Sequence, residues 1–228
     1  NSAEMSAAIH TDKLDYFGSS PTDAGDLVRQ EIVDVLSRCG VKYEKTHHEV
    51  TSSQHEINLE PGDPLTIADR TVLFQYVAKE VAAQYDLHLT FMSKPFTGYN
   101  RNAFHIHISF SDREGTSLCY DEQREHGLSA RLMHFVGGLT GHARGLSIVL
   151  AATVNSYKAY VLGKEAPIVR GWGLRNRSSM VRIPHALSPQ ATRLELRCPD
   201  ASGNVYLQFA VLIFAGLDGI SRQTEAGQ

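Results

Sequence analysis

The spacing of apolar residues predicts several helices along the chain. Apolar positions recur every three to four residues over residues 20–40 and 68–85, which is typical of helices with one buried face. The first stripe comprises Leu27, Val28, Ile32, Val35 and Leu36, and the second comprises Val72, Leu73, Tyr76, Val77 and Val81. Gly40 is expected to end the first helix. Further helices are expected around residues 129–139 and 204–217.

Other segments carry the period of two that is typical of strands, or a short apolar run. Strands are expected over residues 41–50, 55–59, 87–92, 104–110 and 192–197. The last two alternate clearly, so each has one apolar face and one polar face. The polar residues are His105, His107 and Ser109 in the first of these strands and Arg193, Glu195 and Arg197 in the second. The apolar residues behind them are Ile106, Ile108, Phe110, Leu194 and Leu196.

This mixture of elements predicts an α+β fold, in which an antiparallel or mixed sheet carries helices on one face and a polar working face on the other. The chain has 228 residues and 42% hydrophobic residues, which suffices for one substantial core. We therefore expect a single domain or one piece of a larger one. Residues 1–15 are polar and unpatterned and are expected to form a tail or a cut linker.

Charge and cysteine content narrow the classes of partner and compartment. The formal net charge of −3 gives no global basic field, so we expect neither nucleic acid nor a membrane as a partner. The most apolar stretch, residues 205–217, is interrupted by Gln208 and is too short to span a bilayer. The N-terminus carries no apolar signal-peptide segment. Cys39, Cys119 and Cys198 are widely spaced, which favours free thiols in a reducing compartment and a cytoplasmic protein.

The polar strand faces carry the residues with the clearest chemistry. If the two strands are neighbours in one sheet, histidines, a glutamate and arginines meet on one surface. Glu49 and Glu56, on the strand-like segment before the second helix, could join them. Carboxylates with one imidazole suit Mg²⁺ or Mn²⁺ better than zinc. Guanidinium groups beside such ions are what phosphoryl transfer requires, because they neutralise a transferring phosphate.

Other interpretations of these motifs remain open on the residues alone. His105 and His107 form an H-x-H pattern that also occurs in zinc or iron sites, which need a third ligand from a neighbouring strand. His47, His48 and Glu49 do not have the HExxH spacing of zinc proteases. The sequence contains neither a Walker A motif nor GxGxxG, so any bound ATP must be held by another device.

A series of segments in the same order resembles the catalytic domain of type I glutamine synthetases over about 200 residues. The segments are Asp15-Tyr16-Phe17, Pro21-Thr22-Asp23, His47-His48-Glu49-Val50, Gln54-His55-Glu56-Ile57, Phe91-Met92-Ser93-Lys94-Pro95, the strand with His105 and His107, Asn155-Ser156-Tyr157-Lys158, Glu165-Ala166-Pro167, Asn176-Arg177-Ser178, Arg182-Ile183-Pro184, Arg193-Leu194-Glu195-Leu196-Arg197 and Ala215-Gly216-Leu217-Asp218-Gly219-Ile220. The resemblance assigns residues 16–228 to part of such a domain, with a glutamine synthetase and guanido-kinase-like fold.

The resemblance implies a role for each matching residue. It implies ligands of two divalent ions, Mg²⁺ or Mn²⁺: Glu49 and Glu56 for the first, His105 and Glu195 for the second. It implies ATP contacts by His107, Ser109, Arg182 and Arg193. It implies that Arg177 contacts the transferring phosphate, and that Arg197, Asn100 and Arg101 belong to the substrate-binding region. Glu165 matches a flap glutamate that takes a proton from ammonium, and Tyr16 matches part of the ammonium pocket.

The activity implied is an ATP-dependent ligation of glutamate and ammonia through γ-glutamyl phosphate. The resemblance also implies a parent protein that assembles as a homo-oligomer of hexameric rings. The small N-terminal β-grasp domain, a strand with Glu-x-Glu and a C-terminal helical segment, all present in the family, find no match in this sequence. We therefore expect a fragment or a truncated homologue that has no ligase activity alone.

Some positions depart from the family pattern on the amino-acid side. Ala159 stands where the family has the arginine that binds glutamate, and Arg101 replaces a glycine in the loop over residues 100–103. Leu162, Lys164 and the pair Ala151-Ala152 depart as well. Two alternatives to glutamine synthesis therefore stand: a γ-glutamyl-amine ligase or related ligase with another acid or amine, and a non-catalytic homologue. In the first, Arg101 replaces the guanidinium missing at position 159, or the acid is not glutamate.

Overall fold

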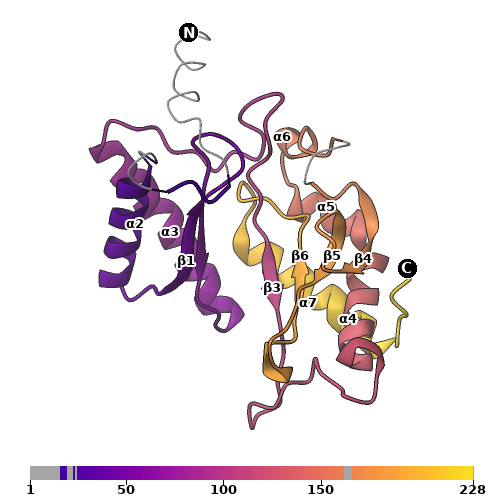
Figure 1. Cartoon of the computed structure of the whole chain (residues 1–228). Helices are drawn as coiled ribbons and strands as arrows, with labels where there is room; N and C mark the ends of the chain where they lie inside the picture. Colours follow the sequence, from indigo (N-terminus) through magenta and orange to yellow (C-terminus); the bar gives the residue numbers. More distant parts are fainter. Residues whose placement is uncertain (1–15, 20–22, 24, 162–165, 228) are drawn as a thin grey trace. The chain divides into compact units, whose positions relative to one another are not determined.

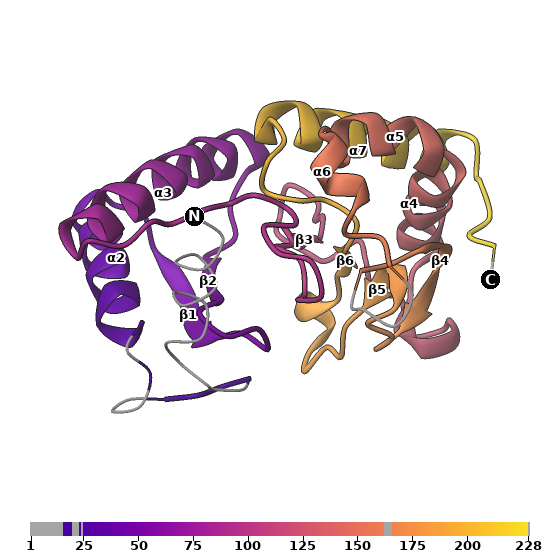
Figure 2. The ribbon, with the colours of Figure 1, turned by 90° about the horizontal axis from the view of Figure 1, so that it is seen from above.

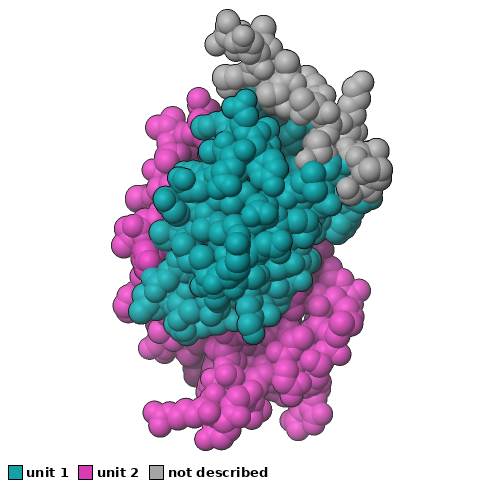
Figure 3. All heavy atoms as spheres, turned by 90° about the vertical axis from the view of Figure 1, so that its left-hand side faces the viewer, with its two compact units in different colours: residues 1–91, 96–100 teal, residues 92–95, 101–228 magenta. Residues whose placement is uncertain are grey.

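The described part of the chain falls into two compact units. The computed structural model describes residues 16–19, 23, 25–161 and 166–227 (Figure 1). Unit 1 contains residues 1–91 and 96–100, and unit 2 contains residues 92–95 and 101–228 (Figure 3). The expected tail over residues 1–15 lies outside the described residues. Helices and a mixed sheet together make the fold α+β, as predicted.

Unit 1 is a two-stranded antiparallel hairpin packed against two helices. The elements are α2 (Asp26–Arg38), β1 (Tyr43–His48), β2 (His55–Leu59) and α3 (Pro64–Gln84) (Figures 1 and 2). Its buried core consists of Val28, Ile32, Leu36, Val41, Val77, Ala78, Val81 and Ala82. This core joins both helices, and Ile57 and Leu59 of β2 pack against it.

Helix α2 confirms most of the predicted stripe. Val28, Ile32 and Leu36 are buried, whereas Leu27 is 71% exposed and does not belong to the buried face. Gly40 lies at φ +77°, a left-handed conformation that costs glycine little and ends the helix. The helix begins at Asp26, so the expected start near residue 20 was too early within the part of the chain that is described.

Helix α3 begins at Pro64, four residues before the predicted start. The side chain of Asp63 accepts a hydrogen bond from the backbone N–H of Thr66 at 3.0 Å, which caps the helix. Proline fits the first turn because its missing N–H has no helical partner there. The predicted stripe was partly wrong, since Val72 and Tyr76 are exposed.

The strand predicted over residues 87–92 does not form. The segment has no strand assignment, and Leu87 and Met92 are 52% and 44% exposed. Leu89 and Phe91 pack instead against the α2–α3 core. The apolar run thus covers the core as an irregular segment.

Unit 2 is built on a four-stranded mixed sheet with the order β3, β6, β5, β4. The strands are β3 (Ile106–Ile108), β4 (Val169–Leu174), β5 (Ser179–Ile183) and β6 (Leu194–Leu196). β6 pairs antiparallel with both β3 and β5, and β4 pairs parallel with β5. The two predicted strands are therefore neighbours, although each is only three residues long. β4 and β5 were not predicted.

The strand register separates apolar from polar residues. Ile106, Leu196 and Val181 form one row across three strands, and each is buried. The adjacent row consists of His107, Glu195 and Arg182 and lies on the opposite face. The prediction that β3 and β6 each carry one polar face is therefore confirmed.

Unit 2 also contains six helices in its described part, three of which cover one side of the sheet. The helices are η1 (Glu125–Gly127), α4 (Ala130–Gly141), α5 (Ala143–Leu150), α6 (Val154–Tyr157), η2 (Pro189–Ala191) and α7 (Val205–Ser221). Figure 2 shows α4, α5 and α7 on the same side of the strands. Helices α4 and α7 confirm the predicted ones, and α5 and α6 were not predicted. Among the described helices, none has both the length and the apolar character required to cross a bilayer.

Glycines bring α4 and α7 into close contact. A Cβ atom on Gly138 would lie 2.1 Å from the carbonyl oxygen of Ala215 and 2.9 Å from the Cα of Gly219. No side chain fits at such distances, so the two helix backbones touch at this point. The contact joins segments that are about 80 residues apart in the sequence.

Candidate active site

Unit 1 carries a cluster of one histidine and two carboxylates at the end of the hairpin. The register pairs His47 with Glu56, and Glu49 follows directly after β1. The Nε2 atom of His47 lies 3.4 Å from a carboxylate oxygen of Glu49 and 3.8 Å from one of Glu56. One ligand atom from each of the three residues lies within 4.8 Å of the other two. We call these three residues the hairpin triad.

The hairpin triad fits a divalent cation by its donor set. Two carboxylates and one imidazole suit ions such as Mg²⁺ and Mn²⁺, as expected from the sequence for the two glutamates. His47 was not assigned a role from the sequence. Its cross-strand pairing with Glu56 is the signal that could have found it, because directly opposed residues share a face of a hairpin.

Aromatic residues lie beside the hairpin triad. The rings of Tyr16 and Phe17 have their centroids 5.3 Å and 4.9 Å from that of His47. The backbone N–H of Phe17 donates to the carbonyl of His48 at 3.0 Å, which attaches this segment to β1. Tyr16, expected in an ammonium pocket, thus lies next to a predicted cation-binding group.

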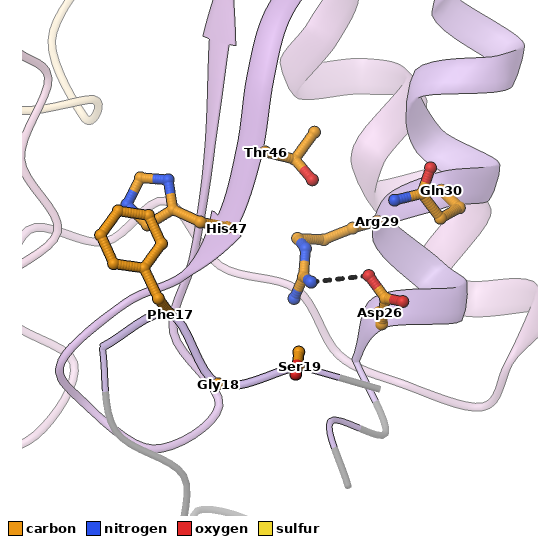
Figure 4. Close-up of a pocket in the computed structure, with 8 residues that line it drawn as sticks. All are labelled: Phe17, Gly18, Ser19, Asp26, Arg29, Gln30, Thr46 and His47. Carbon is orange, nitrogen blue, oxygen red and sulfur yellow. Dashed lines mark hydrogen bonds and ion pairs between the residues drawn. The ribbon is translucent and has the colours of Figure 1, made fainter. Parts of the chain in front are cut away.

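A shallow cavity opens next to these aromatic residues. It measures about 330 Å³ and is lined by Phe17, Gly18, Ser19, Asp26, Arg29, Gln30, Thr46 and His47 (Figure 4). Its polar side chains come from α2, from β1 and from Ser19, which precedes α2. Figure 4 shows Arg29 extending from α2 toward the hairpin, paired with Asp26.

The predicted substrate loop is divided between the two units. Asn100 belongs to unit 1, where its backbone N–H donates to the hydroxyl of Thr51 in the β1–β2 loop at 3.2 Å. Arg101 belongs to unit 2 and is 8% exposed. Its guanidinium donates to the carbonyl of Cys198 at 3.1 Å and also to the carbonyl of Arg197. It lies 5.6 Å from the ring centroid of Tyr160, the neighbour of Ala159.

In unit 2 the carboxylate of Glu195 is the centre of the polar face. Only 2% of Glu195 is exposed, so its charge requires partners within the protein. Arg182 donates to one carboxylate oxygen at 2.5 Å, and Arg197 donates to the other at 2.6 Å. The Nδ1 atom of His105 lies 3.4 Å from the oxygen that Arg197 also contacts. We call Glu195, Arg182, Arg197 and His105 the Glu195 cluster.

The imidazole of His105 is held in its neutral form. Burial, and then the positive charges of Arg197 and Arg101, hold the pKa of His105 well below its usual value. A neutral imidazole offers a lone pair, so His105 can serve as a metal ligand near neutral pH.

Two cations and one anion give the Glu195 cluster an excess of positive charge. Both oxygens of its only carboxylate already accept hydrogen bonds from guanidinium groups. The cluster is therefore better suited to bind an anion such as phosphate than to bind a metal ion. A metal ion bound by His105 and Glu195 would have to share the carboxylate with the two arginines.

Arg193 and His107 form a second pair on the same face. The Nε–H of Arg193 donates to the Nδ1 of His107 at 3.0 Å, and its Nη1 donates to the carbonyl of Ala191 at 3.0 Å. A guanidinium can only donate, so this ring nitrogen of His107 must be unprotonated. Ser109, one residue beyond β3, is exposed.

Arg177 lies in the turn between β4 and β5. Its carbonyl accepts a hydrogen bond from the Nε–H of Arg197 at 2.9 Å, which links the turn to the Glu195 cluster. Arg177 is exposed. Glu165, with Leu162 and Lys164, lies outside the described residues.

Comparison with known proteins decides the family. The family model of the glutamine synthetase catalytic domain matches residues 2–228. The chain belongs to this family. Among curated glutamine synthetases, that of Clostridium saccharobutylicum is 40% identical over 214 residues, which is 94% of this chain and 48% of the relative. That of Thermus thermophilus is 42% identical over 212 residues, 93% of this chain and 47% of the relative. The chain spans about half the length of the curated glutamine synthetases it matches.

Solved structures agree with the sequence comparison. A cryo-EM structure of Plasmodium falciparum glutamine synthetase superposes with a TM-score of 0.88 at 31% identity, covering 92% of this chain and 41% of that one. A structure described as apo GmaS without ligand gives a TM-score of 0.83 at 38% identity, covering 93% and 48%. The described chain therefore has the fold of the glutamine synthetase catalytic domain.

Proposed function

We propose that the protein to which this chain belongs is an ATP-dependent carboxylate–amine ligase of the glutamine synthetase type, active in glutamine biosynthesis and nitrogen metabolism. The proposed reaction joins glutamate and ammonia. The observation that carries the proposal is the Glu195 cluster, in which two guanidinium groups and a neutral imidazole surround one buried carboxylate. This is the surface that phosphate oxygens require, within a chain of the glutamine synthetase family.

The proposed roles follow the chemistry of each group. The hairpin triad would hold one divalent ion through Glu49, Glu56 and His47, and His105 with Glu195 would hold a second. When bound, Mg²⁺ or Mn²⁺ would neutralise charge on the phosphate and carboxylate oxygens. Arg182, Arg193, His107 and Ser109 would contact the nucleotide phosphates, and Arg177 the transferring phosphate.

The proposed reaction has two steps. An oxygen of the substrate carboxylate attacks the γ-phosphorus of ATP, the bond to the β-phosphate oxygen breaks, and ADP leaves with an acyl phosphate formed. The amine nitrogen then attacks the acyl carbon, and phosphate leaves. Arg197 would hold the carboxylate, Asn100 and Arg101 the rest of the acid, while Tyr16 would contact ammonium and Glu165 would take its proton.

Phosphate release tests this proposal most directly. The protein at its natural length, given ATP and Mg²⁺, is expected to release phosphate only when both an acid and an amine are present. The panel should pair glutamate and other carboxylic acids with ammonia and larger primary amines. Absence of acid- and amine-dependent release with every pair would contradict the ligase assignment.

A second candidate is a ligase of the same type with another acid or amine. The observation that favours it concerns Arg101, whose guanidinium is buried beside the ring of Tyr160. The residue that precedes Tyr160 in the sequence is Ala159. When a carboxylate loses a bidentate partner, the binding free energy becomes less favourable by about 2–5 kcal/mol. The alanine at position 159 therefore bears directly on the binding of glutamate.

The double change Arg101→Gly with Ala159→Arg tests this candidate, because it restores the residues that the resemblance implies. We expect it to shift the ratio of kcat/KM values toward glutamate by at least about tenfold, mainly through KM. Equal ratios before and after the change would contradict a role for these two positions in selectivity.

The assembly and location of the protein complete the proposal. We propose a homo-oligomer of hexameric rings and a cytoplasmic location. The mass of the protein at its natural length in solution tests the assembly, and fractionation of its host cells tests the location.

A further inference from the structure

A second cluster of metal-ligand residues lies behind the hairpin triad. One ligand atom each from Asp23, His48 and His55 lies within 4.8 Å of the other two. His48 and His55 are cross-strand partners, and their rings meet edge to face with centroids 5.0 Å apart. His48 follows His47 in β1, and His55 precedes Glu56 in β2. Because neighbouring residues of a strand point to opposite sides, the two clusters occupy opposite faces of the hairpin. Two imidazoles and a carboxylate are a donor set that zinc and cobalt accept.

A guanidinium group takes the place of a metal ion in this cluster. The Nη1 atom of Arg29 lies 2.6 Å from a carboxylate oxygen of Asp23 and 2.6 Å from the Nδ1 of His55. Its Nη2 atom donates to Asp26 at 2.7 Å. The side chains of Arg29 and Asp23 are 6% and 0% exposed. The cluster thus contains a fixed internal cation in contact with two of the three residues that would bind an ion.

Gly25 makes room for this arrangement. A Cβ atom on Gly25 would lie 2.3 Å from the Nε2 of His55, so a side chain there would displace the ring. The φ of Gly25 is −78°, which any residue adopts, so only the contact with His55 requires glycine. The backbone N–H of Gly25 also donates to Asp23 at 2.9 Å.

The cluster is connected to the hairpin triad through the backbone. A guanidinium only donates, so the Nδ1 of His55 accepts from Arg29. The Nδ1 of His48 donates to the carbonyl of Glu49 at 2.6 Å, because a carbonyl only accepts. The N–H of Glu49 donates to the carbonyl of Gln54 at 2.7 Å. Glu49 is therefore held from both sides, and Glu56 follows His55 directly in β2.

We propose that Arg29 is a positioning residue, an internal cation that fixes His48 and His55 and thereby sets the spacing of the carboxylates in the hairpin triad. This inference rests on the proposed cation-binding role of that triad. Partners behind metal ligands typically contribute 10- to 100-fold to metal affinity. Arg29 would act in this way without touching the ion.

Two measurements on the full chain test the proposal. The first is the Mn²⁺ dissociation constant, obtained from the electron paramagnetic resonance signal of free Mn²⁺. We expect Arg29→Ala and Gly25→Ala each to weaken binding by about 10- to 100-fold. Arg38→Ala is the matched control, because Arg38 lies on the same helix with 72% of its side chain exposed, and it should bind as the wild type does.

The second measurement distinguishes a displaced guanidinium from general damage. Removing Arg29 leaves Asp23, His48 and His55 without their internal cation. Arg29→Ala should therefore gain an additional Co²⁺ site, with visible absorption beyond any that the hairpin triad gives in the wild type. The additional change His55→Ala should abolish that absorption. If Arg29→Ala proves unfolded by circular dichroism, Gly25→Ala, which retains every charge, still reports on the Mn²⁺ affinity.

The outcomes separate this inference from the proposed function. Wild-type Mn²⁺ affinity in Gly25→Ala, or a folded Arg29→Ala that gains no Co²⁺ site, would overturn the role of Arg29. If Glu49→Gln leaves Mn²⁺ binding unchanged, the cation-binding role of the triad is wrong, and the positioning role that depends on it is wrong too. The Co²⁺ site would then still show that Arg29 occupies a metal-like position.

Discussion

At the end of the hairpin in unit 1, two glutamates face one histidine, whereas in unit 2 a single glutamate accepts hydrogen bonds from two arginines. Both groups of residues lie on strands or one residue beyond them, and both include an imidazole. Their charge balance is nevertheless opposite. The hairpin triad has excess negative charge and suits a cation, while the Glu195 cluster has excess positive charge and suits phosphate.

The two regions also differ in burial. The side chains of Glu49 and Glu56 are 20% and 33% exposed, so water can still solvate their charges. That of Glu195 is 2% exposed, and its charge depends on the arginines. Glutamates are thus candidate ligands in both units, but only in unit 2 does the fold itself depend on the carboxylate and its ion pairs. Substitutions should therefore affect different measurements in the two units.

The largest effect is expected from Glu195→Gln. The change leaves the buried guanidinium of Arg197 and the partly buried one of Arg182 without their counter-charge. It should lower the free energy of unfolding by about 3–5 kcal/mol. Trp172 is the only tryptophan and lies in β4, so its fluorescence during urea unfolding reports on unit 2. Glu125→Gln is the control, because 88% of that side chain is exposed, and it should change stability by less than about 0.5 kcal/mol. Equal midpoints for both variants would contradict a structural role of Glu195.

Arg101→Ala should give the next largest effect. It removes two hydrogen bonds from a buried charged group to the carbonyls of Arg197 and Cys198. We expect a loss of about 2–3 kcal/mol, measured in the same way. The exposed Arg113→Ala serves as the control. A loss confined to substrate binding, with unchanged unfolding, would show that Arg101 acts only on the substrate.

The hairpin triad should respond in affinity and not in stability. Glu49→Gln or Glu56→Gln removes one carboxylate ligand, and we expect Mn²⁺ affinity to fall at least about tenfold, which corresponds to about 1.4 kcal/mol. Unfolding should change little because both side chains are partly exposed. Glu44→Gln, on the exposed part of β1, is the matched control. A large loss of stability in either variant would remove the contrast with Glu195.

The cysteines give the smallest effect and compare the two units without substitution of the sites. Cys39 of unit 1 is exposed, whereas burial raises the pKa of Cys198 in unit 2 to about 12. Because the thiolate is the reactive form, an aromatic disulfide reagent at pH 8 should modify Cys39 quickly and Cys198 only on unfolding. Cys39→Ser should abolish the fast phase.

The raised pKa of Cys198 also sets a direction for stability. Burial raises the pKa of the Cys198 thiol from its ordinary value of 9.0 to about 12, so the folded protein keeps this thiol neutral at a higher pH than the unfolded chain does. The resulting contribution to stability is complete below about pH 9 and is lost as the pH rises toward 12. Cys198→Ser should reduce this alkaline loss, and an unchanged loss would assign it to other groups.

The sequence predicted the chemistry of the strands better than their lengths. Alternation alone assigned His107 and Glu195 to polar faces, because side chains of a strand point to opposite sides whatever its length. It could not give the ends of the strands, since those depend on where the neighbouring strand stops pairing. β4 was missed because Gly171 and Gly173 interrupt its apolar pattern.

Tertiary packing explains the remaining differences. Residues 87–92 have the composition of a strand, but none of the strands in the described residues pairs with them. Leu89 and Phe91 pack instead against the α2–α3 core. The Asp63-Pro64 pair is a typical start of a helix, so the sequence could have predicted the start of α3 correctly. The role of Arg29 could not be predicted from the sequence, because it depends on a contact with His55, which is 26 positions away. That of His47 required the register of the hairpin, which pairs it with Glu56.

The shortness of β6 limits which insertions the protein can tolerate. Its three residues place Leu194 and Leu196 in the core and Glu195 on the polar face, between β3 and β5. Inserting or deleting one residue here would exchange the two faces and direct a carboxylate into the apolar layer. Length variation among natural or engineered variants should therefore be confined to the connections on either side of this strand, where neither face is fixed.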